Sequence, residues 1–221
     1  MLLLQETKCG SQILKERMGR IWRGCEVMAV DATGATGGFA IIWHPAKVTL
    51  DHFISTPFSL STQFMLVDFG IQGVISNIYG PASPGEKPRF LDSLEFLASW
   101  VDQRHWILGG DFNLITSLQE KKGGTRKLDP HSIRFNSIIH LLILVDVHTN
   151  NGIFTWNNKR IGPQAVASQL DRFLLSESIV TSGGIYNASM IPSTGSDHWP
   201  ISLSWQGLGN QLGKPFRVEH C

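Results

Sequence analysis

Short apolar segments follow one another along most of this chain of 221 residues, and glycine, proline or serine closes nearly every one of them within a few positions. The segments at 39–44 (FAIIWH), 73–79 (GVISNIY) and 106–110 (WILGG) have the length and composition of strands. Helical spacing of apolar residues is confined to a few stretches, which lie at 11–20, 89–101 and 131–144. Many strands of antiparallel character with a few separate helices predict an α+β domain, in which sheets pack face to face and helices lie outside.

The strand-like pattern continues to Trp205 and then stops. We therefore predict one domain over residues 1–205, with residues 206–221 as a C-terminal tail or linker. Hydrophobic residues make up 42% of the chain and charged residues 17%, which is typical of a folded globular domain and excludes a disordered chain. The formal net charge of +1 gives no general attraction to nucleic acid, so binding to nucleic acid would depend on local groups of basic residues.

No segment has the character of a secretion signal or a membrane span. The opening residues, MLLLQ, are too few and lack a basic flank. The longest apolar run, at 138–145, is interrupted by His140 and falls well short of the ~20 residues that cross a bilayer. The cysteines Cys9, Cys25 and Cys221 have no metal-binding spacing. These features predict a soluble intracellular protein without a membrane anchor.

Polar residues stand at the ends of several strand-like segments, where a sheet can bring them close to one another. They are Glu6, Asn77, Tyr79, Asp111, Asn113 and Asp171, with the run Ser196-Asp197-His198 further along the chain. Carboxylate oxygens suit Mg²⁺ or Mn²⁺. Hydrolysis of a phosphate ester needs a metal to neutralise charge, a base to activate water, and donors to the nonbridging oxygens. Each residue also has an ordinary interpretation as a turn or a solvated strand end, so the hypothesis of phosphate ester hydrolysis rests on the whole set.

The sequence further predicts a partner for Asp171 and a special backbone conformation at the two glycines before Asp111. Asp171 lies inside the apolar segment QLDRFLL, where an isolated charge is costly, so it needs a partner from another strand. Gly109 and Gly110 are expected to let the backbone turn sharply and to leave room for a phosphate beside Asp111.

Five segments in order, LQETK, NIYGP, GGDFN, LDRFLLS and GSDHWPI, resemble the motifs of the endonuclease/exonuclease/phosphatase (DNase I-like) superfamily. The residues of these motifs are most similar to those in the endonuclease domain of plant LINE-type non-LTR retrotransposon polyproteins. The resemblance extends from Leu2 to about Trp205. The segment GKPFRVE resembles the connection from that endonuclease toward the reverse transcriptase. The resemblance implies a four-layer α/β/β/α sandwich of two mixed sheets and a Mg²⁺-dependent phosphodiester hydrolase that acts as a DNA endonuclease.

The resemblance also implies a role for each matching residue. Glu6 is the expected principal ligand of Mg²⁺, for which Mn²⁺ could substitute, and Asp197 is expected near the metal. Asp111 would activate or orient the attacking water. Asn113, beside it, would donate toward the phosphate.

The remaining matches concern the substrate. Tyr79 would contact the scissile phosphate, and His198 would donate to a nonbridging oxygen while Asp171 keeps it protonated. Further residues implied in substrate binding are Asn77, Thr155, Trp156 and Ser196. DNA is the implied partner and the nucleus the implied location, with no obligate protein partner. A basic loop could lie against the DNA backbone through Lys121, Lys122, Arg126 and Lys127.

Two departures from the family pattern bear on activity. The family begins with a strand that ends in an asparagine motif, followed by a helix, whereas here Met1 directly precedes LLLQETK. We therefore expect a sandwich that lacks its first strand and helix, with reduced metal affinity and stability. Gln169 stands where the family commonly has arginine. Two alternatives stay open: a noncatalytic remnant of such a domain, and a phosphomonoesterase acting on a small phosphorylated molecule.

Overall fold

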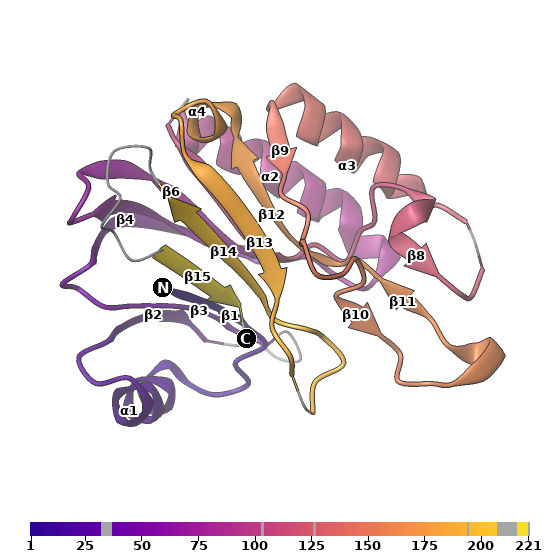
Figure 1. The fold of residues 1–221 in the computed structure, drawn as a ribbon, viewed down its shortest axis with the longest axis horizontal. Coiled ribbons are helices and arrows are strands. Elements are labelled where there is room, and N and C mark those ends of the chain that lie inside the picture. The colour runs from indigo at the N-terminus through magenta and orange to yellow at the C-terminus, as the bar shows by residue number, and fades with distance from the viewer. Residues whose placement is uncertain (32–36, 103, 126, 194, 207–215, 221) are drawn as a thin grey trace.

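Two six-stranded sheets face one another in the computed structural model, which describes residues 1–31, 37–102, 104–125, 127–193, 195–206 and 216–220 (Figure 1). The first sheet has the strand order β13-β14-β15-β1-β3-β2. Its strands are β1 (Leu2–Gln5), β2 (Glu26–Val30), β3 (Phe39–Trp43), β13 (Ile185–Met190), β14 (Ile201–Gln206) and β15 (Phe216–His220). Within it, β1 runs parallel to β15 and the other pairs are antiparallel.

The second sheet has the order β4-β5-β6-β7-β12-β9, with β6 and β7 parallel and the other pairs antiparallel. Its strands are β4 (Val48–Thr56), β5 (Ser59–Leu66), β6 (Ile71–Tyr79), β7 (Trp106–Asp111), β9 (Leu144–Asp146) and β12 (Asp171–Ser176). A small third sheet consists of β8 (Lys121–Lys122), β10 (Trp156–Asn157) and β11 (Ala167–Ser168).

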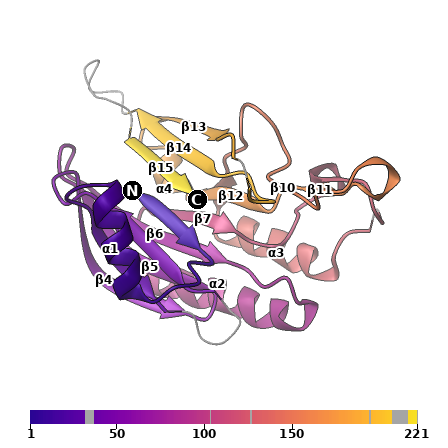
Figure 2. The ribbon, with the colours of Figure 1, turned by 90° about the horizontal axis from the view of Figure 1, so that it is seen from below.

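Helices cover the outer faces of the two large sheets. In Figures 1 and 2, α1 (Ser11–Ile21) lies on one side of the molecule, and α2 (Lys87–Val101) and α3 (Pro130–Leu141) lie on the other. The short helices are α4 (Glu177–Val180) and the 3₁₀ turns η1 (Pro84–Glu86), η2 (Leu118–Glu120) and η3 (Gly162–Gln164). None of the described helices is long and apolar enough to cross a membrane.

Three clusters of buried apolar side chains lie between these layers and hold them together. One fills the space between the large sheets, with Leu3, Ile75 and Phe173 among its fully buried members. A second joins α2 and α3 to the second sheet, and a third joins α1 to the first sheet. The predicted four-layer α/β/β/α sandwich of two mixed sheets is therefore confirmed. Burial of apolar area at about 25 cal/mol per Å² makes these clusters the main source of stability.

The two long helices form where their apolar spacing predicts them, with one difference in length. In α2 the residues at 3.6-residue spacing, including Phe90, Leu94 and Leu97, are buried. In α3 the side chain of Asp129 accepts a hydrogen bond from the backbone N–H of His131, which caps the helix. The prediction that this helix reaches 144 is wrong: Ile143 has a φ of +49°, and β9 follows.

The segment expected as an irregular tail contributes a strand. Residues 216–220 form β15, in which Val218 lies opposite Leu203 of β14 and Glu219 lies opposite Leu2 of β1. An unpaired strand edge exposes backbone hydrogen-bond donors and acceptors. β15 pairs with one edge of β14 and one edge of β1, and so provides partners for the backbone groups of both strands. Part of the segment that the sequence predicted as a tail or linker therefore pairs with the first sheet.

The glycines of β7 serve packing within the sandwich. A Cβ atom at Gly109 would lie 2.6 Å from a ring carbon of Phe173, and one at Gly110 would lie 2.0 Å from the backbone oxygen of Ile78. Gly110 also has a φ of +140°, which disfavours any other residue. The expectation that these glycines make a sharp turn beside a phosphate is therefore wrong, because both belong to β7 and permit the close approach of neighbouring strands.

Candidate active site

Strand register brings three of the predicted site residues into one row. Tyr79 ends β6, Asp111 ends β7 and Asp171 begins β12. Asp111 is the register partner of Tyr79 on one side and of Asp171 on the other. Residues in register on neighbouring strands point to the same face of a sheet, so this row forms the floor of one site.

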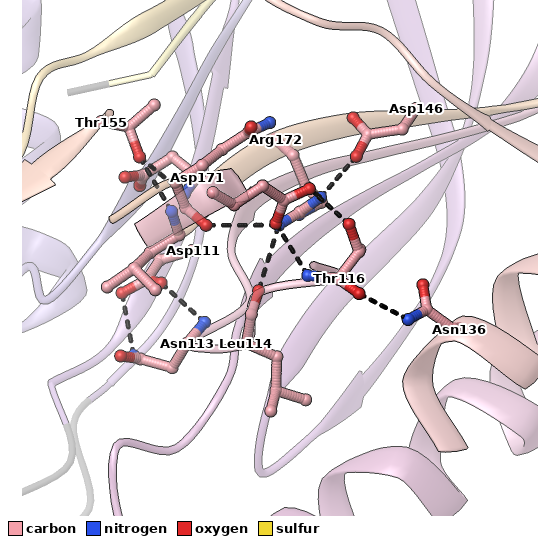
Figure 3. Close-up of polar contacts among 12 residues, drawn as sticks. Asp111, Asn113, Leu114, Thr116, Asn136, Asp146, Thr155, Asp171 and Arg172 are labelled. Carbon is pink, nitrogen blue, oxygen red and sulfur yellow. Dashed lines mark hydrogen bonds and ion pairs between the residues drawn. The ribbon is translucent and has the colours of Figure 1, made fainter. Parts of the chain in front are cut away.

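Asp111 is held by the residue two positions later (Figure 3). Its Oδ1 accepts from the backbone N–H of Asn113 at 2.8 Å, and its Oδ2 accepts from the Asn113 side-chain amide at 2.9 Å. The same amide nitrogen donates to the backbone oxygen of Gly80 at 2.9 Å. Both amide hydrogens of Asn113 are therefore engaged, and its predicted role as a donor toward a phosphate has to be corrected to that of orienting Asp111.

His198 lies between the two aspartates. Its Nδ1 is 2.9 Å from Asp171 Oδ2, and its Nε2 is 3.9 Å from Asp111 Oδ2. The structure thus supplies the partner that a charge in an apolar strand requires. The Asp171 side chain is 1% exposed, that of Asp111 6%, and that of His198 31%, so the imidazole faces the solvent at the mouth of the site.

Burial and neighbouring charges shift the pKa values of Asp111 and His198. Burial, together with the negative charge of Asp171, raises the pKa of Asp111 to about 7. Burial lowers the pKa of His198, but the hydrogen bond to Asp171 and the charges of Asp171, Asp111 and Asp197 outweigh it and raise that pKa to about 9. Near neutral pH the site therefore combines a protonated imidazole with a carboxylate that readily gains or loses a proton.

Glu6 follows β1 in a strained backbone conformation. Its φ is +51°, and a Cβ atom at Gly37 would lie 2.8 Å from its Cα. The Tyr79 hydroxyl donates to Glu6 Oε1, and the Lys8 ammonium lies 3.0 Å from Oε2. These two hydrogen bonds lower the pKa of Glu6, whereas burial and the contact with Glu6 raise the pKa of Tyr79. A carboxylate that stays ionised in a strained position is typical of a functional site.

Asp197 and its neighbours lie at the rim. Trp156 Nε1 donates to Asp197 Oδ2 at 2.9 Å, and the Ser196 hydroxyl accepts from the His198 backbone N–H at 3.1 Å. Burial raises the pKa of Asp197, but the hydrogen bond from Trp156 outweighs it and the pKa is lowered. Ser196 and Asp197 are exposed and Trp156 is half-buried, so all three can be reached from the solvent.

Asn77 has to be corrected from a substrate contact to a structural residue. It is fully buried, and its side-chain amide donates to the backbone oxygens of Leu4 and Ala40, both at 2.9 Å. Gln5 donates to its side-chain oxygen. Because Leu4 and Ala40 belong to the opposite sheet, Asn77 ties the two sheets together beneath the site.

Thr155 is corrected in the same way. It is 1% exposed, and its hydroxyl accepts from the backbone N–H groups of Leu170 and Asp171, both at 3.0 Å. It therefore fixes the start of β12, and with it Asp171, and is shielded from the solvent (Figure 3).

The oxygens at the site suit a hard divalent cation. Among the described residues, no three His, Cys, Asp or Glu side chains form a cage that could hold a metal ion. Mg²⁺ keeps several of its waters and usually takes one or two carboxylates, so it needs no such cage. Glu6 is ionised and accessible, and Asp197 carries a second ionised carboxylate at the rim, so the donors present fit Mg²⁺.

Solved structures of two endonucleases and a phosphatase have a similar fold. The chain superposes on the endonuclease domain of TRAS1, a telomere-specific non-LTR retrotransposon, with a TM-score of 0.63 and 17% identity over 95% of this chain and 98% of that one. The chain has a DNase I-like fold. The AP endonuclease LMAP from Leishmania major gives a TM-score of 0.69 at 14% identity over 93% of this chain and 77% of that one.

A phosphatase shares this DNase I-like fold as well. The mannosyl-6-phosphatase Bt3783 from Bacteroides thetaiotaomicron gives a TM-score of 0.58 at 14% identity over 89% of this chain and 82% of that one. No protein-family model matches the sequence, and no curated protein matches it. The similarity therefore lies in three-dimensional structure, at a level of identity that indicates the fold and not the reaction.

Some residues around the site were not predicted. Lys8 contacts Glu6, although the segment LQETK already placed a basic residue two positions away. Arg172 directly follows Asp171, and its guanidinium pairs with Glu120 at 2.8 Å. The signal for Arg172 was a second charged residue in the apolar segment QLDRFLL, which needs partners for the same reason as Asp171.

Replacing Asp171 by asparagine should lower the pKa of both Asp111 and His198. Asp111 loses a like charge that opposes its ionisation, and His198 loses the carboxylate that stabilises its protonated form. In the Asp171→Asn variant the pKa of His198 should fall from about 9 toward its ordinary value of 6.5. NMR titration in the presence of EDTA measures this change. The raised pKa stabilises the folded wild type fully below about pH 6.5, and this contribution is lost as the pH rises through about 9. An Asp68→Asn variant, which changes an exposed carboxylate paired with Lys47, is the control and should leave both values unchanged.

Proposed function

We propose that the protein is a Mg²⁺-dependent phosphodiester hydrolase that nicks DNA. The observation that carries the proposal is the geometry of His198, whose two ring nitrogens face Asp171 at 2.9 Å and Asp111 at 3.9 Å. The longer of these distances separates His198 Nε2 from Asp111, whose carboxylate can take up a proton near neutral pH. A base and a protonated donor at this spacing are what the hydrolysis of a phosphate ester requires.

Each of the central residues has a defined part in the proposed reaction. Asp111, oriented by Asn113, takes a proton from the attacking water. His198 donates from Nε2 to a nonbridging phosphate oxygen, because its Nδ1 is held by Asp171. The protonated imidazole thereby stabilises the negative charge that develops on the phosphate. Tyr79, through its hydroxyl, keeps Glu6 in place at the side of the site.

Glu6 is the proposed principal residue for Mg²⁺, with Asp197 close by, and Mn²⁺ could take the same place. When bound, the ion supplies neutralisation of charge on the phosphate. Lys8 pairs with Glu6 and balances the charge of that carboxylate.

DNA is the proposed substrate because basic residues gather on the small third sheet and its loops. Lys122, Lys127, Lys159 and Arg160 are exposed, and Lys121 is half-buried. Arg126, which the sequence placed in the same basic loop, lies outside the described residues. The sheet contains Trp156, which donates to Asp197 at the rim, so the basic residues and the site belong to neighbouring segments. The motif resemblance and the TRAS1 endonuclease domain support an origin in a LINE-type retroelement.

A phosphomonoesterase is the second candidate. The mannosyl-6-phosphatase Bt3783 has a similar fold, and the chemistry proposed for Asp111 and His198 serves a phosphate monoester equally well. A noncatalytic domain is the third possibility, and the absence of turnover on both kinds of substrate would support it.

Conversion of supercoiled plasmid to the nicked circle tests the proposal. We expect nicking with Mg²⁺ and none with EDTA. Binding to a DNA backbone weakens steeply with salt, so the apparent KM should rise several-fold between about 50 and 200 mM salt. Turnover of a small phosphate monoester would change little over this range. Folded protein that hydrolyses only the monoester would support the second candidate, and folded protein that hydrolyses neither would support the third.

A further inference from the structure

Arg172 places a fully buried positive charge beside the site, and no step proposed so far uses it. Its side chain has 0% exposure and follows Asp171 in β12. The guanidinium lies 5.8 Å from the centre of the Phe135 ring. Its hydrogen-bond acceptors are the carboxylates of Glu120 and Asp146 and the backbone oxygens of Leu114 and Gln169 (Figure 3).

These acceptors fall into two groups. Leu114 and Glu120 belong to the segment that follows Asn113, and Gln169 lies two residues before Asp171. Arg172 Nη2 donates to Glu120 at 2.8 Å, to Leu114 O at 3.1 Å and to Gln169 O at 3.2 Å. Asp146 belongs instead to β9, at the edge of the second sheet. Nη2 thus holds the two segments of the site, whereas Nη1 donates to Asp146 of the edge strand and, at 3.4 Å, to Glu120 Oε1.

Glu120 organises the segment between it and the site. Its carboxylate accepts from the backbone N–H of Thr116 at 2.7 Å and from the Thr116 hydroxyl. Its backbone oxygen accepts from the N–H of Gln169 at 2.9 Å. A side chain of α3 joins the same group, because Asn136 donates to Thr116 O at 2.7 Å. The segment after Asn113 is therefore folded around one carboxylate.

Arg172 and Glu120 remain ionised despite their burial. Burial raises the pKa of Glu120, but hydrogen bonds from Arg172 and Thr116 outweigh it and the pKa is lowered. A buried ion pair adds little net stability compared with apolar residues, because removing two charges from water is costly. A group of this kind is better explained by the geometry that it imposes.

We propose that Arg172 and Glu120 form a positioning pair, which fixes the segment carrying Asn113 against the strand carrying Asp171 and so maintains the separation of Asp111 and His198. The proposal rests on the proposed hydrolysis. Neither residue touches the substrate, and both act through the segments that they hold. Displacing a reacting group by about 1 Å can slow an enzyme about a hundredfold, so a small loosening of this segment should be visible in the rate.

Two matched variants separate positioning from support of the fold. Glu120→Gln and Asp146→Asn are isosteric, and each removes one of the two carboxylates that share the guanidinium. Each leaves Arg172 with one carboxylate partner. We expect Glu120→Gln to lower kcat for nicking about tenfold or more, with the Kd for DNA changed by less than about twofold. Asp146→Asn should leave kcat within about twofold, whatever it does to the midpoint of urea unfolding.

Amide hydrogen exchange supplies a readout that does not depend on activity. The N–H of Phe112 donates to Leu170 O, and that of Gln169 donates to Glu120 O, so both report on the joined segments. The N–H of Val147 donates to Phe173 O and reports on the end of β9. Glu120→Gln should speed exchange at Phe112 and Gln169, and Asp146→Asn should speed exchange at Val147 alone.

Equal loss of kcat in the two variants, or a loss that follows their stability, would show that the pair only supports the fold. If the wild type has no activity, the proposed function fails, and the exchange experiment still decides the positioning role. Faster exchange at Phe112 and Gln169 in Glu120→Gln alone would then sustain it. The same exchange pattern in both variants would overturn it.

Discussion

Replacing Asp111 by asparagine should slow DNA nicking at least about a hundredfold in a protein that remains folded. Positioned general bases contribute about 10²–10⁴-fold to a rate, and asparagine cannot take a proton from water. The hydrogen bond from the Asn113 backbone N–H can form to an amide oxygen as well as to a carboxylate, so the local turn should persist.

The pH dependence of the nicking rate of the wild type is a second test of the role of Asp111. Asp111 must be ionised to act as a base, and its raised pKa makes the rate increase as the pH rises through about 7. His198 must be protonated to donate, so the rate should fall as the pH rises through about 9. A bound cation favours the carboxylate, so higher concentrations of Mg²⁺ should move the lower limb to lower pH.

The control for Asp111→Asn is Asp51→Asn, which changes an exposed carboxylate in β4. It should nick at the rate of the wild type, and circular dichroism should be the same for all three proteins. A rate within about threefold of the wild type for Asp111→Asn would exclude this residue as the base, because that loss is far below the contribution of a general base.

Replacing Arg172 by methionine should lower the free energy of unfolding by about 3–5 kcal/mol. The substitution keeps most of the side-chain volume but removes the partner of the buried Glu120 and of the largely shielded Asp146, and an uncompensated buried charge costs this much. The side chains of Glu120 and Asp146 are only 7% and 15% exposed, so neither can regain full hydration without movement of the backbone. Urea unfolding followed by circular dichroism measures the effect.

A triple variant tests the reason for this loss. Arg172→Met combined with Glu120→Leu and Asp146→Leu removes all three charges, and it should recover most of the stability lost by Arg172→Met. It should not recover nicking, since no group then holds the segment after Asn113. A loss below about 1 kcal/mol in Arg172→Met would mean that water reaches the two carboxylates, which contradicts a buried cluster.

Much of the site followed from local patterns in the sequence. Strand-like segments and the polar residues at their ends predicted Tyr79, Asp111 and Asp171 correctly as neighbours, because strand ends meet at one edge of a sheet. The cost of a charge in an apolar strand predicted that Asp171 has a partner, and His198 is that partner. Apolar spacing likewise predicted α2, whose buried face matches it.

The failures share a physical reason, which is that the decisive contact comes from a segment distant in the chain. Asn77 is bonded to Leu4 and Ala40, which lie 73 and 37 positions away. The residues next to Asn77 in the sequence do not indicate that its side-chain amide donates to backbone oxygens of the other sheet. The same holds for β15, which forms between β14 and β1, because both of its partners come from distant parts of the chain.

The local sequence was therefore sufficient for the type and order of most strands and helices, because backbone preferences and burial patterns act over a few neighbouring positions. It also indicated the polar strand ends that we propose as the site. Packing of distant segments was needed to assign roles to those residues. It made Asn77 and Thr155 structural residues, directed the amide hydrogens of Asn113 to Asp111 and to the backbone oxygen of Gly80, and joined Arg172 to Glu120 across 52 positions. Hydrogen bonds and ion pairs are satisfied in three dimensions, and a residue's role depends on which partners the fold leaves to it.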